Sequence, residues 1–195
     1  NRGNGTELFV YNTLENTYAE IDINPGTNSS NPTEFTPIND KLFYSATGSS
    51  GKELYIYDNT NGTNTLIDIN TGSVGSNPLH FAAAGNLVFY NAEGANGVEL
   101  YIYDCLKKTN TLVDLRPGLD DSDPRLFTPI GNKVLFNADG PSGYELNIAK
   151  FIHPIAITSS TVNVCLGSPL NINIEAAGGT PSNLSYNWTG VNGFT

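Results

Sequence analysis

The chain repeats one sequence pattern at a fixed spacing of 46 residues. The tetrad Gly-x-Glu-Leu begins at Gly5, Gly51, Gly97 and Gly143. Longer stretches repeat in the same register: GKELYIYD returns as GVELYIYD, and LIDINTG matches EIDINPG and LVDLRPG. No insertion or deletion interrupts the spacing. One structural unit is therefore copied along the chain, and its length favours a repeat architecture.

Each copy contains four short runs with the composition of β-strands. In the second copy the runs are Thr33–Ile38, Lys41–Ala46, Glu53–Asp58 and Asn64–Ile69. They are rich in Tyr, Phe, Ile, Leu and Thr and alternate imperfectly in polarity, as half-buried strands do. Asn39-Asp40 between the first two runs accepts positive φ and predicts a tight hairpin. No repeat shows a sustained helical period, so we expect almost no helix.

Four antiparallel strands in a unit of this length are typical of one blade of a β-propeller. We expect the first run of each copy to be the innermost strand. In this register the chain supplies the last two strands of one blade, two complete blades and three strands of a fourth. Because propellers have roughly four to eight blades, we expect the chain to be a fragment of a longer protein. We predict an all-β fold in which residues 1–151 form a partial β-propeller.

The repeat resembles a known family. GKELYIYDNTNGTNTLIDINTGSVGSNP, which begins at Gly51, is similar to the ELWxxDGT repeat of large secreted proteins of the Bacteroidota. Tyr or Phe stands where that signature has Trp, and Asn59-Thr60 stands where it has Asp-Gly. The layout is less closely similar to TolB-type blades. The resemblance covers residues 1 to about 150. It implies a propeller in an exported protein and no catalytic residues, because the signature is structural.

The sequence after Phe151 leaves the repeat register. Three strand-like runs follow, at Ile155–Val164, Leu170–Ala176 and Ser185–Thr189. The stretches VCLGS, AAGG and YNWTGVNGFT resemble the first half of an immunoglobulin-like module of bacterial surface proteins. Since a sandwich domain needs about 100 residues, we expect residues 152–195 to be a truncated immunoglobulin-like β-sandwich. The resemblance places any disulfide partner of Cys165 in the missing half.

Composition excludes several classes of partner. The net charge of −10 disfavours nucleic acid and anionic membranes. No apolar run approaches the length that spans a bilayer, and no Cys/His spacing is typical of zinc. We therefore expect no nucleic-acid partner, no membrane insertion and no cofactor, while the resemblance to the ELWxxDGT repeat implies a secreted or cell-surface protein.

The repeated glutamates Glu7, Glu53, Glu99 and Glu145 have two interpretations. They form either a ring of carboxylates that binds a cation or ligand, or hydrogen bonds to backbone N–H groups that join blades. We favour the second interpretation, because a residue present in every copy serves the blade.

Three further carboxylates, Asp120, Asp121 and Asp123, occur in one copy only. Flexible oxygen ligands of this kind suit Ca²⁺, but the loop lacks the spacing and terminal Glu of an EF-hand. A solvated acidic loop is the favoured interpretation, so we predict no metal site.

The best candidates for ligand contact are variable positions on the predicted innermost strand. His80 is one of them, and we take Glu34 and Arg125 as its counterparts in the neighbouring copies. We expect all three side chains to approach the central channel. Variation there is also what a functionally neutral channel lining would show.

Catalysis has little support, because neither His80 nor His153 belongs to a recognisable nucleophile motif. Our first hypothesis is a non-enzymatic module that acts in adhesion or display, with an extracellular protein or glycan as ligand. The order of propeller and immunoglobulin-like module resembles giant Bacteroidota adhesins exported by the type IX system, some of which serve gliding. A carbohydrate-active enzyme or sugar-binding subunit that uses the channel, and a purely structural spacer, remain alternatives.

Overall fold

The computed structural model of the chain describes residues 3, 5–118 and 120–151. These residues form β-strands and no helix, as the absence of helical periodicity predicted. The chain divides into two units, Asn1–Lys150 and Phe151–Thr195. The predicted immunoglobulin-like segment, residues 152–195, lies outside the described residues. Within the described part, no helix is long and apolar enough to cross a membrane.

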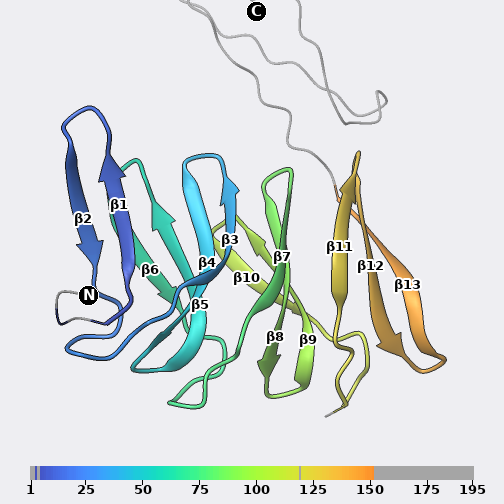
Figure 1. The fold of residues 1–195 in the computed structure, drawn as a ribbon. Coiled ribbons are helices and arrows are strands. Elements are labelled where there is room, and N and C mark those ends of the chain that lie inside the picture. The colour runs from blue at the N-terminus through green and yellow to red at the C-terminus, as the bar shows by residue number, and fades with distance from the viewer. Residues whose placement is uncertain (1–2, 4, 119, 152–195) are drawn as a thin grey trace, which may run out of the picture. The chain divides into compact units, whose positions relative to one another are not determined.

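The strands form four antiparallel sheets that follow the sequence repeat (Figure 1). The first sheet contains β1 (Leu8–Asn12) and β2 (Thr17–Ile21). The second contains β3 (Thr33–Ile38), β4 (Lys41–Gly48), β5 (Gly51–Asp58) and β6 (Thr63–Ile67). The third contains β7 (Leu79–Ala84), β8 (Leu87–Gly94), β9 (Gly97–Asp104) and β10 (Thr109–Val113). The fourth contains β11 (Arg125–Ile130), β12 (Lys133–Gly140) and β13 (Gly143–Lys150). In each sheet consecutive strands are neighbours.

The four strands predicted for the second copy are confirmed, with small differences at their ends. β3 has the predicted bounds. β4 and β5 reach further, because their pairing continues to Gly48 opposite Gly51. β6 ends before the predicted Ile69, because its pairing with β5 stops at Ile67. The distribution of strands over the four sheets is also the predicted one, whereas closure into a propeller stays a prediction.

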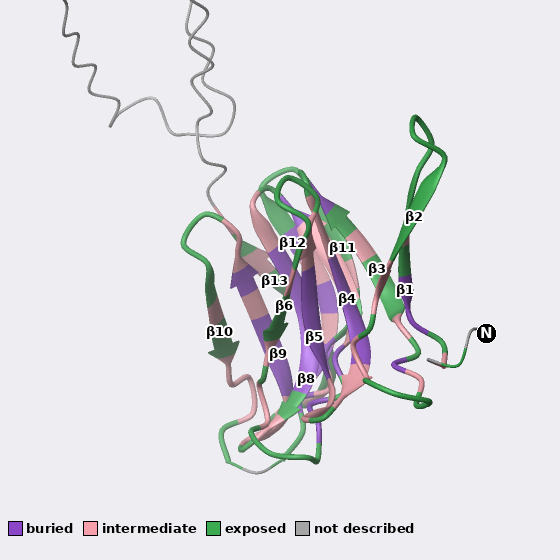
Figure 2. Ribbon diagram, turned by 90° about the vertical axis from the view of Figure 1, so that its left-hand side faces the viewer, coloured by how far each residue is buried: buried purple, intermediate pink, exposed green. Residues whose placement is uncertain are grey.

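The first strands of the last three sheets, β3, β7 and β11, lie side by side (Figure 1). Each contains an irregularity in its pairing with the next strand, between Thr33 and Thr36 in β3 and at the same place in β7 and β11. The last strands, β6 and β10, are largely exposed, whereas β4, β5, β8 and β9 are mostly buried (Figure 2). Burial thus concentrates on the two middle strands of each complete sheet.

Successive sheets pack face to face through alternate residues of these middle strands, as the period-two geometry of a strand requires. Leu54 and Ile56 of β5 belong to the same buried cluster as Val88 and Tyr90 of β8 and Tyr101 of β9. We call the side of a sheet that carries Leu54, or its equivalent in another copy, the forward face. The forward face of one copy is therefore buried by the sheet of the next copy.

Candidate functional site

The repeated glutamates lie at the end of each sheet where the linker to the next copy passes. In the third sheet, Glu99 Oε2 accepts a hydrogen bond from the Leu115 backbone N–H at 2.9 Å. Its Oε1 accepts one from the Ser122 N–H at 3.1 Å. The carbonyl oxygen of Ser122 accepts from the Asp139 N–H of the fourth sheet at 2.7 Å. Glu99 therefore holds the linker, and the linker holds the next sheet.

The first sheet repeats this arrangement, and the second repeats it in part, because Glu53 Oε2 accepts from a backbone N–H and from the Ser76 hydroxyl, while Oε1 has no hydrogen-bond partner among the described residues. The equivalent donors are Ile23 and Ser30 for Glu7, at 2.9 Å each, and Ile69 for Glu53, at 3.2 Å. All three carboxylates are buried, and burial raises the pKa of the Glu53 carboxyl. The interpretation as hydrogen bonds to backbone N–H groups is confirmed for these three glutamates.

Glu145 has the same motif but a different environment. Its side chain is exposed, and no hydrogen bond to its carboxylate is found within the described residues. The positions that would supply its donors, one repeat after Leu115 and Ser122, lie outside those residues.

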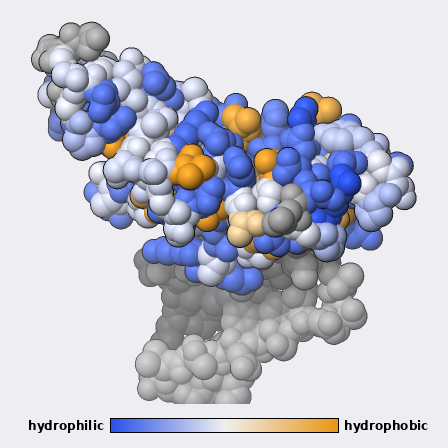
Figure 3. Space-filling view, turned by 90° about the horizontal axis from the view of Figure 1, so that it is seen from below, coloured by the Kyte–Doolittle hydropathy of each residue, from blue (hydrophilic) through white to orange (hydrophobic). Residues whose placement is uncertain are grey.

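Figure 3 views the first unit from the linker end, where the coloured surface is mostly hydrophilic with small, separate hydrophobic spots.

The acidic loop Asp120–Asp123 makes contacts within the protein. Asp121 Oδ1 accepts a hydrogen bond from the Val98 backbone N–H at 2.7 Å. Asp120 lies 3.4 Å from the guanidinium of Arg116 in an exposed ion pair. The described residues contain no group of three or more His, Cys, Asp and Glu side chains that could hold a metal ion. The loop thus serves in part to attach the linker to β9.

The candidate ligand contacts lie on the irregular segments of β3, β7 and β11. Glu34, His80 and Leu126 have φ values of 60°, 61° and 58°, and all three are exposed. This shared left-handed conformation, rare for residues other than Gly, marks one equivalent position in three copies. We call these three residues the inner row.

Our assignment of Arg125 to this position was wrong. Arg125 pairs with Asn137 as Thr33 pairs with Ser45, so it stands one residue before the inner row. Counting the repeat strictly from His80 leads to Leu126, and this count was available from the sequence.

The structure brings Glu34 and His80 together. The backbone N–H of His80 donates to Glu34 Oε2 at 2.9 Å. Arg125 instead pairs with Asp123, with 3.0 Å between Nε and Oδ1, and Tyr144 donates its hydroxyl to the Asp123 carbonyl at 3.0 Å. Within the described residues, no hydrogen bond joins Arg125 to Glu34 or His80. The inner row therefore offers a carboxylate and an imidazole for polar contacts, with Arg125 held separately.

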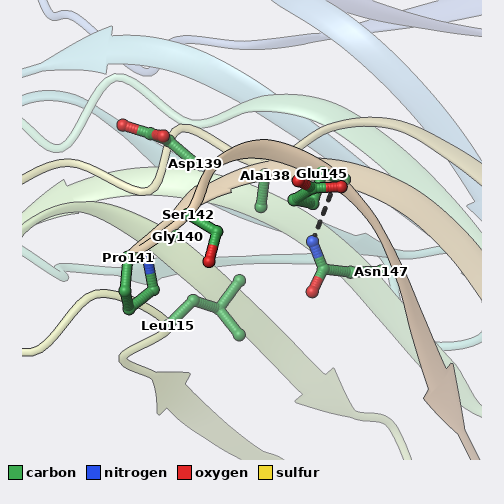
Figure 4. A pocket seen from close by; sticks show the side chains of 8 residues that line it. All are labelled: Leu115, Ala138, Asp139, Gly140, Pro141, Ser142, Glu145 and Asn147. Atoms are coloured by element: carbon green, nitrogen blue, oxygen red, sulfur yellow. Dashed lines mark hydrogen bonds between the residues drawn. The ribbon is translucent and has the colours of Figure 1, made fainter.

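A small pocket of about 200 Å³ lies beside the turn between β12 and β13 (Figure 4). Its lining comes from this turn, from β12 and β13, and from the linker after β10; the residues are Leu115, Ala138, Asp139, Gly140, Pro141, Ser142, Glu145 and Asn147. Sequence analysis did not identify this pocket. The signal that it overlooked is Asn147, which stands where the two preceding copies have Tyr.

Comparison with known proteins does not identify a family for this chain. No protein-family model matches the chain, and no curated protein matches it.

Proposed function

We propose that the four sheets are successive blades of a β-propeller and that the chain is a binding or display module of a large secreted or cell-surface protein. Its activity on this proposal is non-enzymatic adhesion to an extracellular protein or glycan. The regular order of strands in each sheet and the contact between β3, β7 and β11 support the propeller. On the same proposal, residues 152–195 begin an immunoglobulin-like module.

One observation carries the proposal: the repeated carboxylates are buried, whereas the inner-row residues, which differ between copies, are exposed. The repeated carboxylates Glu7, Glu53 and Glu99 are buried and hold linkers, so they build the scaffold. The inner row differs in every copy and is exposed. Exposed variable residues on a rigid scaffold are where binding specificity is expected.

The contacts of the inner row favour binding over catalysis. His80 meets Glu34 through its backbone N–H rather than its imidazole, so the two side chains form no acid–base pair.

Burial raises the pKa of the Cys105 thiol to about 11, whereas a nucleophilic cysteine needs a lowered pKa. The resemblance to the ELWxxDGT repeat supports the same proposal and suggests a Bacteroidota adhesin of the type IX or gliding kind.

The test is a binding screen of the complete chain against immobilised glycans and extracellular matrix proteins. For any ligand found, we expect Glu34→Ala combined with His80→Ala to weaken binding at least about tenfold. The matched control combines Glu15→Ala and Lys107→Ala, which remove exposed charges away from the inner row, and should leave affinity unchanged. Unchanged binding by the inner-row variant, or turnover of a glycan that this variant abolishes, would contradict the proposal.

A further inference from the structure

The third strands of the complete sheets carry a tyrosine that the fourth sheet lacks. Tyr55 stacks on Tyr44 with ring centroids 5.8 Å apart, and Tyr101 stacks on Tyr90 at the same distance. Both Tyr55 and Tyr101 are buried. The repeat places Asn147 at this position in β13, and its side chain is much shorter than a tyrosine ring.

Each of these tyrosine rings ends against a glycine. A Cβ placed on Gly48 would lie 2.4 Å from the Tyr55 hydroxyl oxygen, and one on Gly94 would lie 2.4 Å from that of Tyr101. At the equivalent Gly140, the nearest atom to such a Cβ is a backbone oxygen at 3.9 Å. The glycine that makes room for a ring is thus retained in the fourth sheet, although β13 has Asn147 in place of the tyrosine.

The pocket of about 200 Å³ lies at this place, with both Gly140 and Asn147 in its lining (Figure 4). Leu115 and Ala138 give it apolar walls. The Asn147 amide donates to the backbone oxygen of Glu145 at 3.0 Å, and this bond holds the Asn147 side chain at one side of the pocket. An apolar cavity of about 150 Å³ is large enough for benzene, so one phenol ring fits this volume.

We propose that this pocket binds the hydroxyphenyl ring of a tyrosine side chain from a partner protein. The ring takes the place that Tyr55 and Tyr101 fill in the complete sheets, with its hydroxyl toward Gly140 and its face toward the apolar walls. The pocket shares no residue with the inner row, so this binding is separate from the proposed ligand contact there.

The experiment is an NMR titration of the complete chain with two probes. p-Cresol represents the ring alone, and N-acetyl-tyrosinamide represents a tyrosine within a polypeptide. We expect both to bind saturably and to shift the amide signals of Gly140 and Asn147. Asn147→Tyr fills the pocket with the chain's own ring, so affinity for both probes should fall at least tenfold and the melting temperature should rise.

Two further variants separate the pocket from general effects on folding. Asn147→Ala leaves the space open and should retain binding. Tyr101→Asn opens the equivalent space beside Gly94 and should add a second binding event. The proposal is overturned if neither probe saturates the wild-type chain, or if Asn147→Tyr binds as well as wild type. Binding of p-cresol without N-acetyl-tyrosinamide overturns a protein tyrosine as the occupant.

Discussion

The third and fourth sheets carry the same Gly-x-Glu-Leu tetrad in opposite environments. Glu99 and Leu100 are 0% and 2% exposed, whereas Leu146 is 63% exposed and Glu145 is also exposed. The third sheet has β10, a linker and the next sheet around the tetrad. Among the described residues, the fourth sheet has none of these. Burial of the tetrad is therefore a property of the interface between two copies, as expected for a repeat protein in which each unit depends on its neighbour.

The largest expected effect concerns the glycine that opens the tetrad. Gly51 and Gly143 both have positive φ, 88° and 101°, which costs another residue about 1–2 kcal/mol. A Cβ on Gly51 would also lie 2.5 Å from the backbone nitrogen of Gly75 in the following linker, whereas nothing lies within 4 Å of one on Gly143. We expect Gly51→Ala to lower the free energy of unfolding by about 4 kcal/mol and Gly143→Ala by about 1–2 kcal/mol.

Urea unfolding of the two variants measures this difference. Equal losses for Gly51→Ala and Gly143→Ala would show that the close approach between the tetrad and the linker has no effect on the free energy of unfolding.

The next effect concerns the tetrad glutamate. Glu99→Ala leaves the half-buried N–H of Leu115 without its carboxylate acceptor, whereas the Ser122 N–H keeps a second acceptor, the Val98 carbonyl oxygen at 3.0 Å. We expect a total loss of about 1–3 kcal/mol, the cost of one polar group left unpaired. Glu145→Ala is the matched control, because the same residue is exposed there, and it should change stability by less than about 0.5 kcal/mol. A large effect at Glu145 would instead indicate that residues outside the described range close this copy as well.

The smallest expected effect is the pH dependence of stability that comes from Cys105. Burial is the main reason that the pKa of its thiol is raised to about 11. The folded state thus keeps the thiol protonated where the unfolded thiol, with an ordinary pKa of 9.0, already ionises. Stability from this group is complete below pH 9 and declines between pH 9 and 11. With Cys165→Ser as background, alkylation of Cys105 by iodoacetamide should show a midpoint near pH 11. A midpoint near pH 9 in the folded chain would contradict the burial.

The elements of the fold were predictable because the repeat gives the same evidence several times. Turn residues and strand runs agreed between copies, so β3–β6 appeared nearly at their predicted bounds. Asn39 has the positive φ expected of the tight turn between the first two runs, and Gly85 and Gly131, one and two repeats later, share it. The role of Glu7, Glu53 and Glu99 was predictable for the same reason, since repetition distinguishes a structural residue from a specific one.

The candidate sites were less predictable, because they depend on local departures from the repeat. Counting the repeat from His80 leads to Leu126, but the left-handed backbone that the inner row shares occurs where the strand pairing is irregular, and a strand drawn as regular gives no sign of that conformation. The pocket arises from one missing ring at Asn147. Its existence also depends on Gly140, which pairs with Gly143 at the end of the hairpin and whose counterparts Gly48 and Gly94 meet the hydroxyl end of a tyrosine ring; this is a matter of packing rather than composition.

The most direct test of the interface between copies is hydrogen exchange at the linker amides. Leu115 and Ser122 lie outside the strands, yet their N–H groups donate to the buried Glu99 carboxylate. We predict that both amides exchange as slowly as those of β9. In Glu99→Ala, protection should disappear at Leu115 but remain at Ile69, which donates to Glu53. Exchange of Leu115 and Ser122 in the wild-type chain at the rate of exposed turn amides would contradict the account.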